Sequence, residues 1–159
     1  MEKKIIFFSG KRGGINHLIP IFTKLNKFKN LNLKFIFSDM HISKKFGQTI
    51  LEHNELKKKI IKNKSLIDGD SEYSRSISIS LGLKNNANII KSEKPDLIVI
   101  LGDRSELFSI SIPAMLNSIP LLHLYGGDKT QGCTDESTRH AITMLSNYHV
   151  VSNNRSKKN

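Results

Sequence analysis

Lys94-Pro95-Asp96-Leu97-Ile98-Val99-Ile100-Leu101-Gly102-Asp103-Arg104-Ser105-Glu106 is the stretch that decides the fold class. Its centre, residues 97–101, is an uninterrupted apolar run between a proline and a glycine. Such a run is typical of a β-strand that is buried on both faces, as strands are in a parallel sheet covered by helices. Residues 105–117 are then predicted to form a helix, in which Pro113 is tolerated at the cost of a kink.

The segments on either side of this stretch also alternate between strand and helix. We expect strands at residues 5–8, 33–37, 121–125 and 148–151, and helices at 15–28, 73–92 and 135–146. Pro20 should lie near the start of the first helix, and the second should be broken or kinked near Gly82. Residues 42–70 are polar and lysine-rich, and indicate no more than a helix and a short strand. The alternation predicts an α/β fold: one Rossmann-like domain over residues 1–159, with a parallel sheet and helices on both of its faces.

Composition excludes several functional classes. With 38% hydrophobic and 25% charged residues, the sequence is typical of a globular protein, and no apolar run reaches the ~18 residues of a membrane span. The net charge of +11 raises the possibility of nucleic-acid binding. The excess is mostly lysine, as at 57–59 and 157–158, and no nucleic-acid module accompanies it, so we interpret it as a solvated basic surface.

The single cysteine, Cys133, excludes an internal disulfide, and the apolar N-terminal run is too short for a signal peptide. We expect a cytoplasmic setting.

Polar or flexible residues follow four of the predicted strands. These segments are residues 9–14, 39–41, 102–104 and 126–128. Because ligands of parallel α/β sheets bind beyond the carboxyl ends of the strands, four such segments on one edge predict a ligand site.

The individual residues of these segments allow two interpretations. Residues 9–14, which we call the glycine loop, contain three glycines and Arg12 just before a helix. This pattern suits a phosphate, but it also suits a tight turn. Asp103 can be a base, an anchor for sugar hydroxyls or a helix cap. Asp135 with Arg139, and Glu136 with His140, share helix faces and can be surface ion pairs. His123, within an apolar strand, is typical of a core histidine. No metal-ligand spacing is present.

Taken together, the motifs resemble the hydrolysing UDP-N-acetylglucosamine 2-epimerases, which make N-acetylmannosamine or its relatives for sialic and legionaminic acids. The matching segments, in order, are Ser9-Gly10-Lys11-Arg12, Met40-His41-Ile42-Ser43, residues 94–106, Ile119-Pro120, His123, Gly126-Gly127-Asp128, Asp135-Glu136-Ser137 and Arg139-His140-Ala141-Ile142-Thr143. The resemblance extends over essentially the whole chain.

This resemblance implies a GT-B-like fold of two Rossmann-like domains with the substrate between them. It implies a reaction in which UDP leaves the anomeric carbon, the C2 proton is lost, and water adds to a glycal intermediate. By the same resemblance, the catalytic residues are Asp103, Asp135 and Arg139. The residues expected to bind substrate are Gly10, Arg12 on the phosphate side, His41 near the sugar, Arg104, Glu106, Tyr125, Gly127 and His140. The resemblance implies a homodimer for the complete enzyme. We expect no metal, since no ligand spacing is present, and no cofactor.

Two features depart from the family pattern. Many relatives carry a catalytic glutamate where this chain has Tyr125, and either Asp128 replaces that carboxylate or the role is lost. The second, UDP-binding domain is absent from this sequence, so we expect a truncated or split half with little activity alone. The alternatives are a non-catalytic nucleotide-sugar-binding remnant or subunit, and the acceptor-side domain of a GT-B glycosyltransferase.

Overall fold

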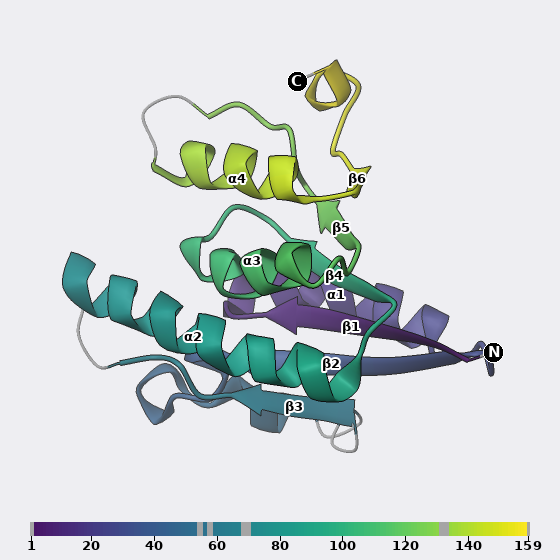
Figure 1. Ribbon diagram of the computed structural model, residues 1–159, viewed down its shortest axis with the longest axis horizontal. Coiled ribbons are helices and arrows are strands. Elements are labelled where there is room, and N and C mark those ends of the chain that lie inside the picture. The colour runs from purple at the N-terminus through teal and green to yellow at the C-terminus, as the bar shows by residue number, and fades with distance from the viewer. Residues whose placement is uncertain (1, 54–55, 57–58, 68–70, 131–133, 159) are drawn as a thin grey trace.

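A parallel sheet of six strands, in the order β3-β2-β1-β4-β5-β6, runs through the protein (Figure 1). The computed structural model describes residues 2–53, 56, 59–67, 71–130 and 134–158, so Cys133, Lys57 and Lys58 lie outside the described residues. The strands are β1 (Lys3–Ser9), β2 (Leu31–Ser38), β3 (Ile60–Asn63), β4 (Leu97–Leu101), β5 (Leu121–Leu124) and β6 (Tyr148–Val150). The predicted parallel sheet is confirmed.

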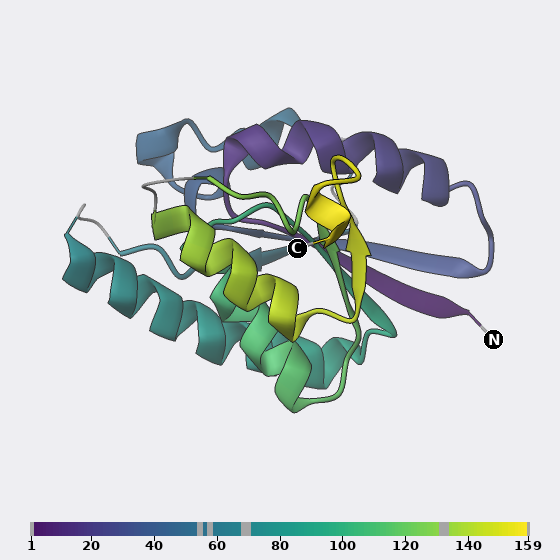
Figure 2. The ribbon, with the colours of Figure 1, turned by 90° about the horizontal axis from the view of Figure 1, so that it is seen from above.

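Helices cover both faces of this sheet, as Figure 2 shows. One face carries α1 (Arg12–Leu25), and the other carries α2 (Glu72–Glu93), α3 (Phe108–Leu116) and α4 (Thr134–Leu145). Short 3-10 turns complete the connections: η1 (Asp39–His41), η2 (Lys44–Phe46), η3 (Thr49–Glu52), η5 (Ser105–Leu107) and η6 (Ser156–Lys158). Among the described residues, no helix is long and apolar enough to cross a bilayer.

Successive side chains of the central strands point to opposite faces and therefore enter two separate cores. Beneath α2, α3 and α4, the core includes Ile6, Phe8, Ile98, Ile100, Ile110 and Ile142. Beneath α1, it includes Phe7, Phe35, Phe37, Val99, Leu18 and Phe22. Burial of both faces explains why residues 97–101 are apolar without alternation.

The structure corrects three expectations about the helices and the segment before α2. Pro20 lies well inside α1, because the helix begins at Arg12 in the glycine loop; Pro20 is exposed there, on the side facing away from the sheet. Gly82 does not break α2, which is continuous from Glu72 to Glu93. A Cβ on Gly82 would lie 2.8 Å from Cβ of Ser109, so the glycine instead permits close packing of α2 on α3. The described part of residues 42–70 contains 3-10 turns and β3 rather than a regular helix.

Pro113 lies inside α3, where its ring nitrogen has no hydrogen to donate to the carbonyl oxygen of Ser109. The side chain of Asn86 on α2 supplies the missing donor, with Nδ2 at 3.0 Å from that oxygen. Asn86 is fully buried, and its own Oδ1 accepts from Nδ2 of Asn63 at 2.8 Å. A backbone group left without a partner by the proline is therefore satisfied by the neighbouring helix.

The strand order changes direction between β1 and β4. From β1 the chain proceeds outward through β2 and β3, and then returns to add β4, β5 and β6 on the other side. At such a switch point the loops after the two central strands separate and leave a crevice. Here those loops begin with Gly10 after β1 and Gly102 after β4.

Candidate functional site

Two adjoining cavities lie at this switch point. The first, which we call the loop cavity, has a volume of about 370 Å³ and is lined by the glycine loop together with His17, Asp103 and Tyr125. The second, the acid cavity, has a volume of about 310 Å³ and lies toward α2. Its polar walls include Asp39, Ser65 and Arg75, and its apolar walls include Met40, Phe46, Leu66 and Ile79. Gly10, Arg104 and Glu106 line both cavities and separate them.

The carboxylate of Asp103 forms an ion pair with the guanidinium of Arg139 on α4. The Arg139 side chain is only 6% exposed, whereas that of Asp103 is 31% exposed and lines the loop cavity. Arg139 also donates from Nη1 to the carbonyl oxygen of Asp128 at 2.6 Å. The interpretation of Asp103 as a helix cap is wrong: Arg104 occupies the N-cap position of η5, and Asp103 is held from α4 instead.

His123 supports this arrangement from beneath. It is fully buried, and its Nε2 lies 2.7 Å from the carbonyl oxygen of Gly102. A carbonyl oxygen only accepts, so Nε2 carries the hydrogen, and Nδ1 accepts from the hydroxyl of Thr143 at 3.2 Å. Burial lowers the pKa of His123, which favours this neutral form. His123 therefore joins β5, the loop after β4 and α4, as a core histidine.

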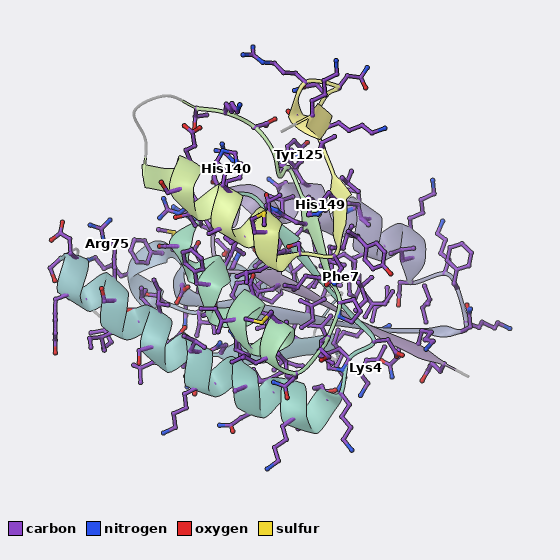
Figure 3. The ribbon with its side chains drawn as sticks, turned by 45° about the horizontal axis from the view of Figure 1, so that its top comes forward. Lys4, Phe7, Arg75, Tyr125, His140 and His149 are labelled. Atoms are coloured by element: carbon purple, nitrogen blue, oxygen red, sulfur yellow. The ribbon has the colours of Figure 1, made fainter. Side chains whose placement is uncertain are left out.

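Three strand ends at this edge turn through the left-handed backbone region. Asp39 after β2 has φ of 48°, Gly102 after β4 has 94°, and Tyr125 after β5 has 63°. For the two residues with side chains this conformation is strained, and such strain is concentrated at functional sites. Tyr125 lines the loop cavity, and its ring centroid lies 5.7 Å from that of His17 (Figure 3 labels Tyr125).

Asp128 is turned toward the end of the described chain. Its Oδ1 accepts hydrogen bonds from Ser152, at 2.8 Å, and from Ser156. These hydrogen bonds, that from Ser156 first, lower the pKa of Asp128. Gly127 packs against the main chain of Ser156. Asp128 is not among the residues that line the two cavities, so its replacement of a carboxylate at position 125 stays a prediction.

Arg12 and His41, both expected near the substrate, differ in exposure. Arg12 is the first residue of α1 and is exposed at the edge of the glycine loop. His41 has no exposed surface, and it bonds Oγ of Ser9 through Nε2 at 2.9 Å and Oγ1 of Thr49 through Nδ1 at 2.7 Å. Burial lowers the pKa of His41 to about 4. The buried side chain of His41 therefore holds Ser9, at the end of β1, from inside the protein.

Two further predicted residues lie on α4. His140 contacts Glu136 at 3.5 Å, which confirms the expected pair one turn apart. Asp135 lies one turn before Arg139, and among the described residues no ion pair joins these two. Asp135 is not among the residues lining the two cavities, so the expectation that it shares a cavity with Asp103 stays a prediction.

Comparison with known proteins identifies the family. Residues 23–159 match the family model described as UDP-N-acetylglucosamine 2-epimerase. The chain belongs to this family. It is 35% identical over 157 residues to a GDP/UDP-N,N'-diacetylbacillosamine 2-epimerase (hydrolyzing) of Campylobacter jejuni, a match that covers 99% of this chain and 41% of that protein. It is 30% identical over 162 residues to the UDP-N,N'-diacetylbacillosamine 2-epimerase (hydrolyzing) of Legionella pneumophila, covering 99% and 42%.

The fold agrees with the family assignment. The crystal structure of a Neisseria meningitidis UDP-GlcNAc 2-epimerase bound to UDP-GlcNAc superimposes with a TM-score of 0.80 at 21% identity, covering 98% of this chain and 42% of that one. The predicted Rossmann-like half of a GT-B-like fold is confirmed. The chain thus spans about two fifths of the length of these 2-epimerases.

Several residues of the two cavities were not singled out from the sequence. His17 faces Tyr125 from the second turn of α1, and Arg75 and Ser65 line the acid cavity. Arg75 lies near the first turn of α2, at the carboxyl-end edge of the sheet, away from Lys4 at the start of β1 (Figure 3). No motif marks these positions, because α2 and the segment after β3 reach the site only through the tertiary fold.

Proposed function

We propose that this chain is the N-terminal, sugar-side domain, residues 1–159, of a hydrolysing UDP-N-acetylhexosamine 2-epimerase. The observation that supports the proposal best is that Asp103 lines the loop cavity while the buried side chain of Arg139, on α4, fixes its carboxylate. A carboxylate at the mouth of a cavity, next to a glycine loop, has the chemistry that the reaction needs.

The reaction has two steps that balance without a cofactor. In the first, a carboxylate removes the proton from C2, the C1–O bond breaks, and its electron pair leaves with UDP, which produces a 1,2-glycal. In the second, water supplies a hydroxyl to C1 while a proton returns to C2 on the opposite face. We assign the proton at C2 to Asp103, with Arg139 orienting it. Asp135 is proposed as the second carboxyl, and Asp128 as the substitute for the glutamate absent at Tyr125.

The diphosphate is proposed to lie over the glycine loop. Main-chain N–H groups at the start of α1 and the exposed guanidinium of Arg12 suit an anion there. The remaining contacts to UDP are proposed to come from a second Rossmann-like domain, in the same polypeptide or in a separate subunit, and the complete enzyme is proposed to be a homodimer. Its closure would exclude water from the departing diphosphate.

Release of UDP tests the proposal. The chain is incubated with UDP-GlcNAc or its diacetamido counterpart, alone and with the product of any adjacent reading frame. Release that appears in the mixture and disappears in Asp103→Asn supports the assignment. Asp96→Asn is the matched control, because Asp96 lies at the opposite edge of the sheet and pairs with Lys3.

The alternatives predict other results. A non-catalytic remnant or subunit would bind UDP-sugar without releasing UDP in any combination. The acceptor-side domain of a GT-B glycosyltransferase would release UDP only when an acceptor is added, and would not depend on Asp103.

A further inference from the structure

Two acidic side chains from distant segments, Asp39 and Glu106, lie against Gly10. A Cβ on Gly10 would lie 2.7 Å from Cγ of Glu106 and 3.2 Å from Oδ2 of Asp39. The absence of a side chain at this position therefore lets the two groups approach each other. Both line the acid cavity, and only Glu106 also lines the loop cavity.

The surroundings of the two carboxyl groups differ. Asp39 accepts from the hydroxyl of Ser65 at 2.9 Å and from that of Ser38 at 3.3 Å, and both bonds favour its ionised form. Glu106 has no such hydroxyl donor among the described residues. Its closest cation is Arg104, whose buried Nε lies 3.6 Å from Oε2 and makes no hydrogen bond in the part of the chain that the structure describes.

Protonation follows from these surroundings. Burial raises the pKa of both carboxyl groups. For Glu106, a hydrogen bond from its own main-chain N–H and the charges of Arg104 and Lys11 act against this rise in pKa, while the charge of Asp39 adds to it. Arg75 is the remaining charged group on the cavity wall. The hydroxyl groups of Ser38 and Ser65 stabilise the ionised form of Asp39, whereas Glu106 accepts from no hydroxyl group of the described residues, so Glu106 is the candidate for the protonated member of the pair.

A carboxylate beside a protonated carboxyl group is complementary to an amide. The carboxylate accepts the amide N–H, and the acid donates its O–H to the amide oxygen. The cavity also offers an apolar wall for a methyl group, made by Met40, Phe46 and Ile79.

We propose that the acid cavity is the subsite for an acetamido group of the sugar, with Asp39 accepting its N–H, Glu106 donating to its carbonyl oxygen, and the methyl group lying against Phe46 and Ile79. This inference rests on the proposed function, since it assigns the sugar of that reaction. It also makes Asp39 and Glu106 specificity determinants, distinct from the carboxylate at position 103.

The test uses two free sugars that differ only in the acetamido group. The ¹⁵N-labelled chain is titrated with N-acetylmannosamine and with mannose while amide resonances are followed by NMR. We expect N-acetylmannosamine to shift the amides of Ser65, Ser78 and Ile79 and to bind at least about tenfold more tightly than mannose, since an amide that makes both hydrogen bonds gains roughly 1.4 kcal/mol or more. Equal affinity for the two sugars, or shifts confined to Gly13, His17 and Tyr125, would overturn the proposal.

Two substitutions separate the roles of the carboxyl groups. Glu106→Gln keeps a donor that no longer titrates, so its affinity for N-acetylmannosamine should not fall as pH rises from 5 to 8, whereas the affinity of the unaltered chain should fall. Asp39→Asn keeps a side chain that tolerates the left-handed backbone but removes the charged acceptor, and should weaken binding several-fold. Glu52→Gln, on an exposed turn, is the control and should change neither property. Identical pH dependence in Glu106→Gln and the unaltered chain would contradict the assignment.

Failure of the subsite is distinguishable from failure of the proposed function. If UDP is released from the nucleotide sugar but the two free sugars bind alike, only the subsite is wrong. If N-acetylmannosamine is selected but no combination releases UDP, the subsite stands and the epimerase assignment is wrong.

Discussion

Arg139 on α4 forms an ion pair with Asp103, 36 residues earlier in the chain, and so ties the turn after β4 to the helix after β5. The arginine is almost completely buried and the aspartate is partly open to the loop cavity. The same contact therefore serves stability, by neutralising a buried charge, and the proposed chemistry, by fixing a carboxylate. The two consequences can be measured separately.

The first prediction concerns stability. Asp103→Asn leaves the buried guanidinium of Arg139 without its counter-charge, and should lower the free energy of unfolding by about 2 kcal/mol, less than for a fully buried pair because Asp103 is partly solvated. Urea denaturation measures the change. Asp135→Asn, on the same helix face, should change it by less than about 0.5 kcal/mol. If Asp135→Asn lowered the free energy of unfolding as much, the negative charge near α4, rather than the Asp103–Arg139 ion pair, would account for the stability.

The second prediction concerns His41, whose pKa is lowered to about 4 in the fold and is near 6.5 in an unfolded chain. Below pH 6.5 the unfolded chain binds a proton that the folded protein rejects, so stability should decrease from pH 7 toward pH 4, by up to about 3 kcal/mol from this group. The free energy of unfolding of His41→Asn, measured by urea titration over the same range, should fall less steeply. Parallel curves would contradict the burial of a neutral imidazole.

The third prediction concerns Asp39, whose pKa is raised by burial. A raised carboxyl pKa contributes stability at low pH that is lost as pH rises through the folded-state pKa. Asp39→Asn has no such charge, and asparagine tolerates the left-handed backbone at φ of 48°. The variant should therefore gain stability relative to the unaltered chain as pH rises from 4 to 8. Thermal unfolding across this range measures the difference, and a difference of the opposite sign would contradict the raised pKa.

The fourth prediction compares two glycines within helices. Gly82→Ala brings a Cβ to 2.8 Å from Cβ of Ser109, and should cost about 1–3 kcal/mol by forcing α2 from α3. Gly13→Ala, in the first turn of α1 with no atom within 4 Å of the added Cβ, should stabilise the protein by about 0.5–1 kcal/mol. Chemical denaturation of both variants measures the contrast. Equal effects would show that helix propensity alone controls both sites.

Local patterns were sufficient to predict the sheet and its edge. The apolar run 97–101 and the glycine loop have periodicities and turn residues that decide their structure within a few positions. Parallel pairing then brings Gly10 and Asp103 to one edge. The motifs around Asp103 and Arg139 likewise predicted the family, which the family model confirms.

Other features depend on contacts between distant residues. A glycine such as Gly82 inside a helical pattern suggests a break in the helix, but its role here is set by the contact with Ser109 on another helix. Likewise, residues 135–139 suggested a local ion pair, whereas Arg139 is turned inward to Asp103. The acid cavity was not predicted because Arg75 and Ser65 reach it from segments without a recognisable motif.

The bond from Asn86 to the carbonyl oxygen opposite Pro113 has a consequence for how this sequence can change. As long as position 113 is proline, position 86 must supply a donor. An aliphatic residue at position 86 would leave the buried carbonyl oxygen of Ser109 without a hydrogen bond. Once position 113 regains an N–H, that demand on position 86 lapses. In natural variants of this domain, proline at 113 without an amide at 86 should accordingly be rare, whereas the reverse combination should be tolerated.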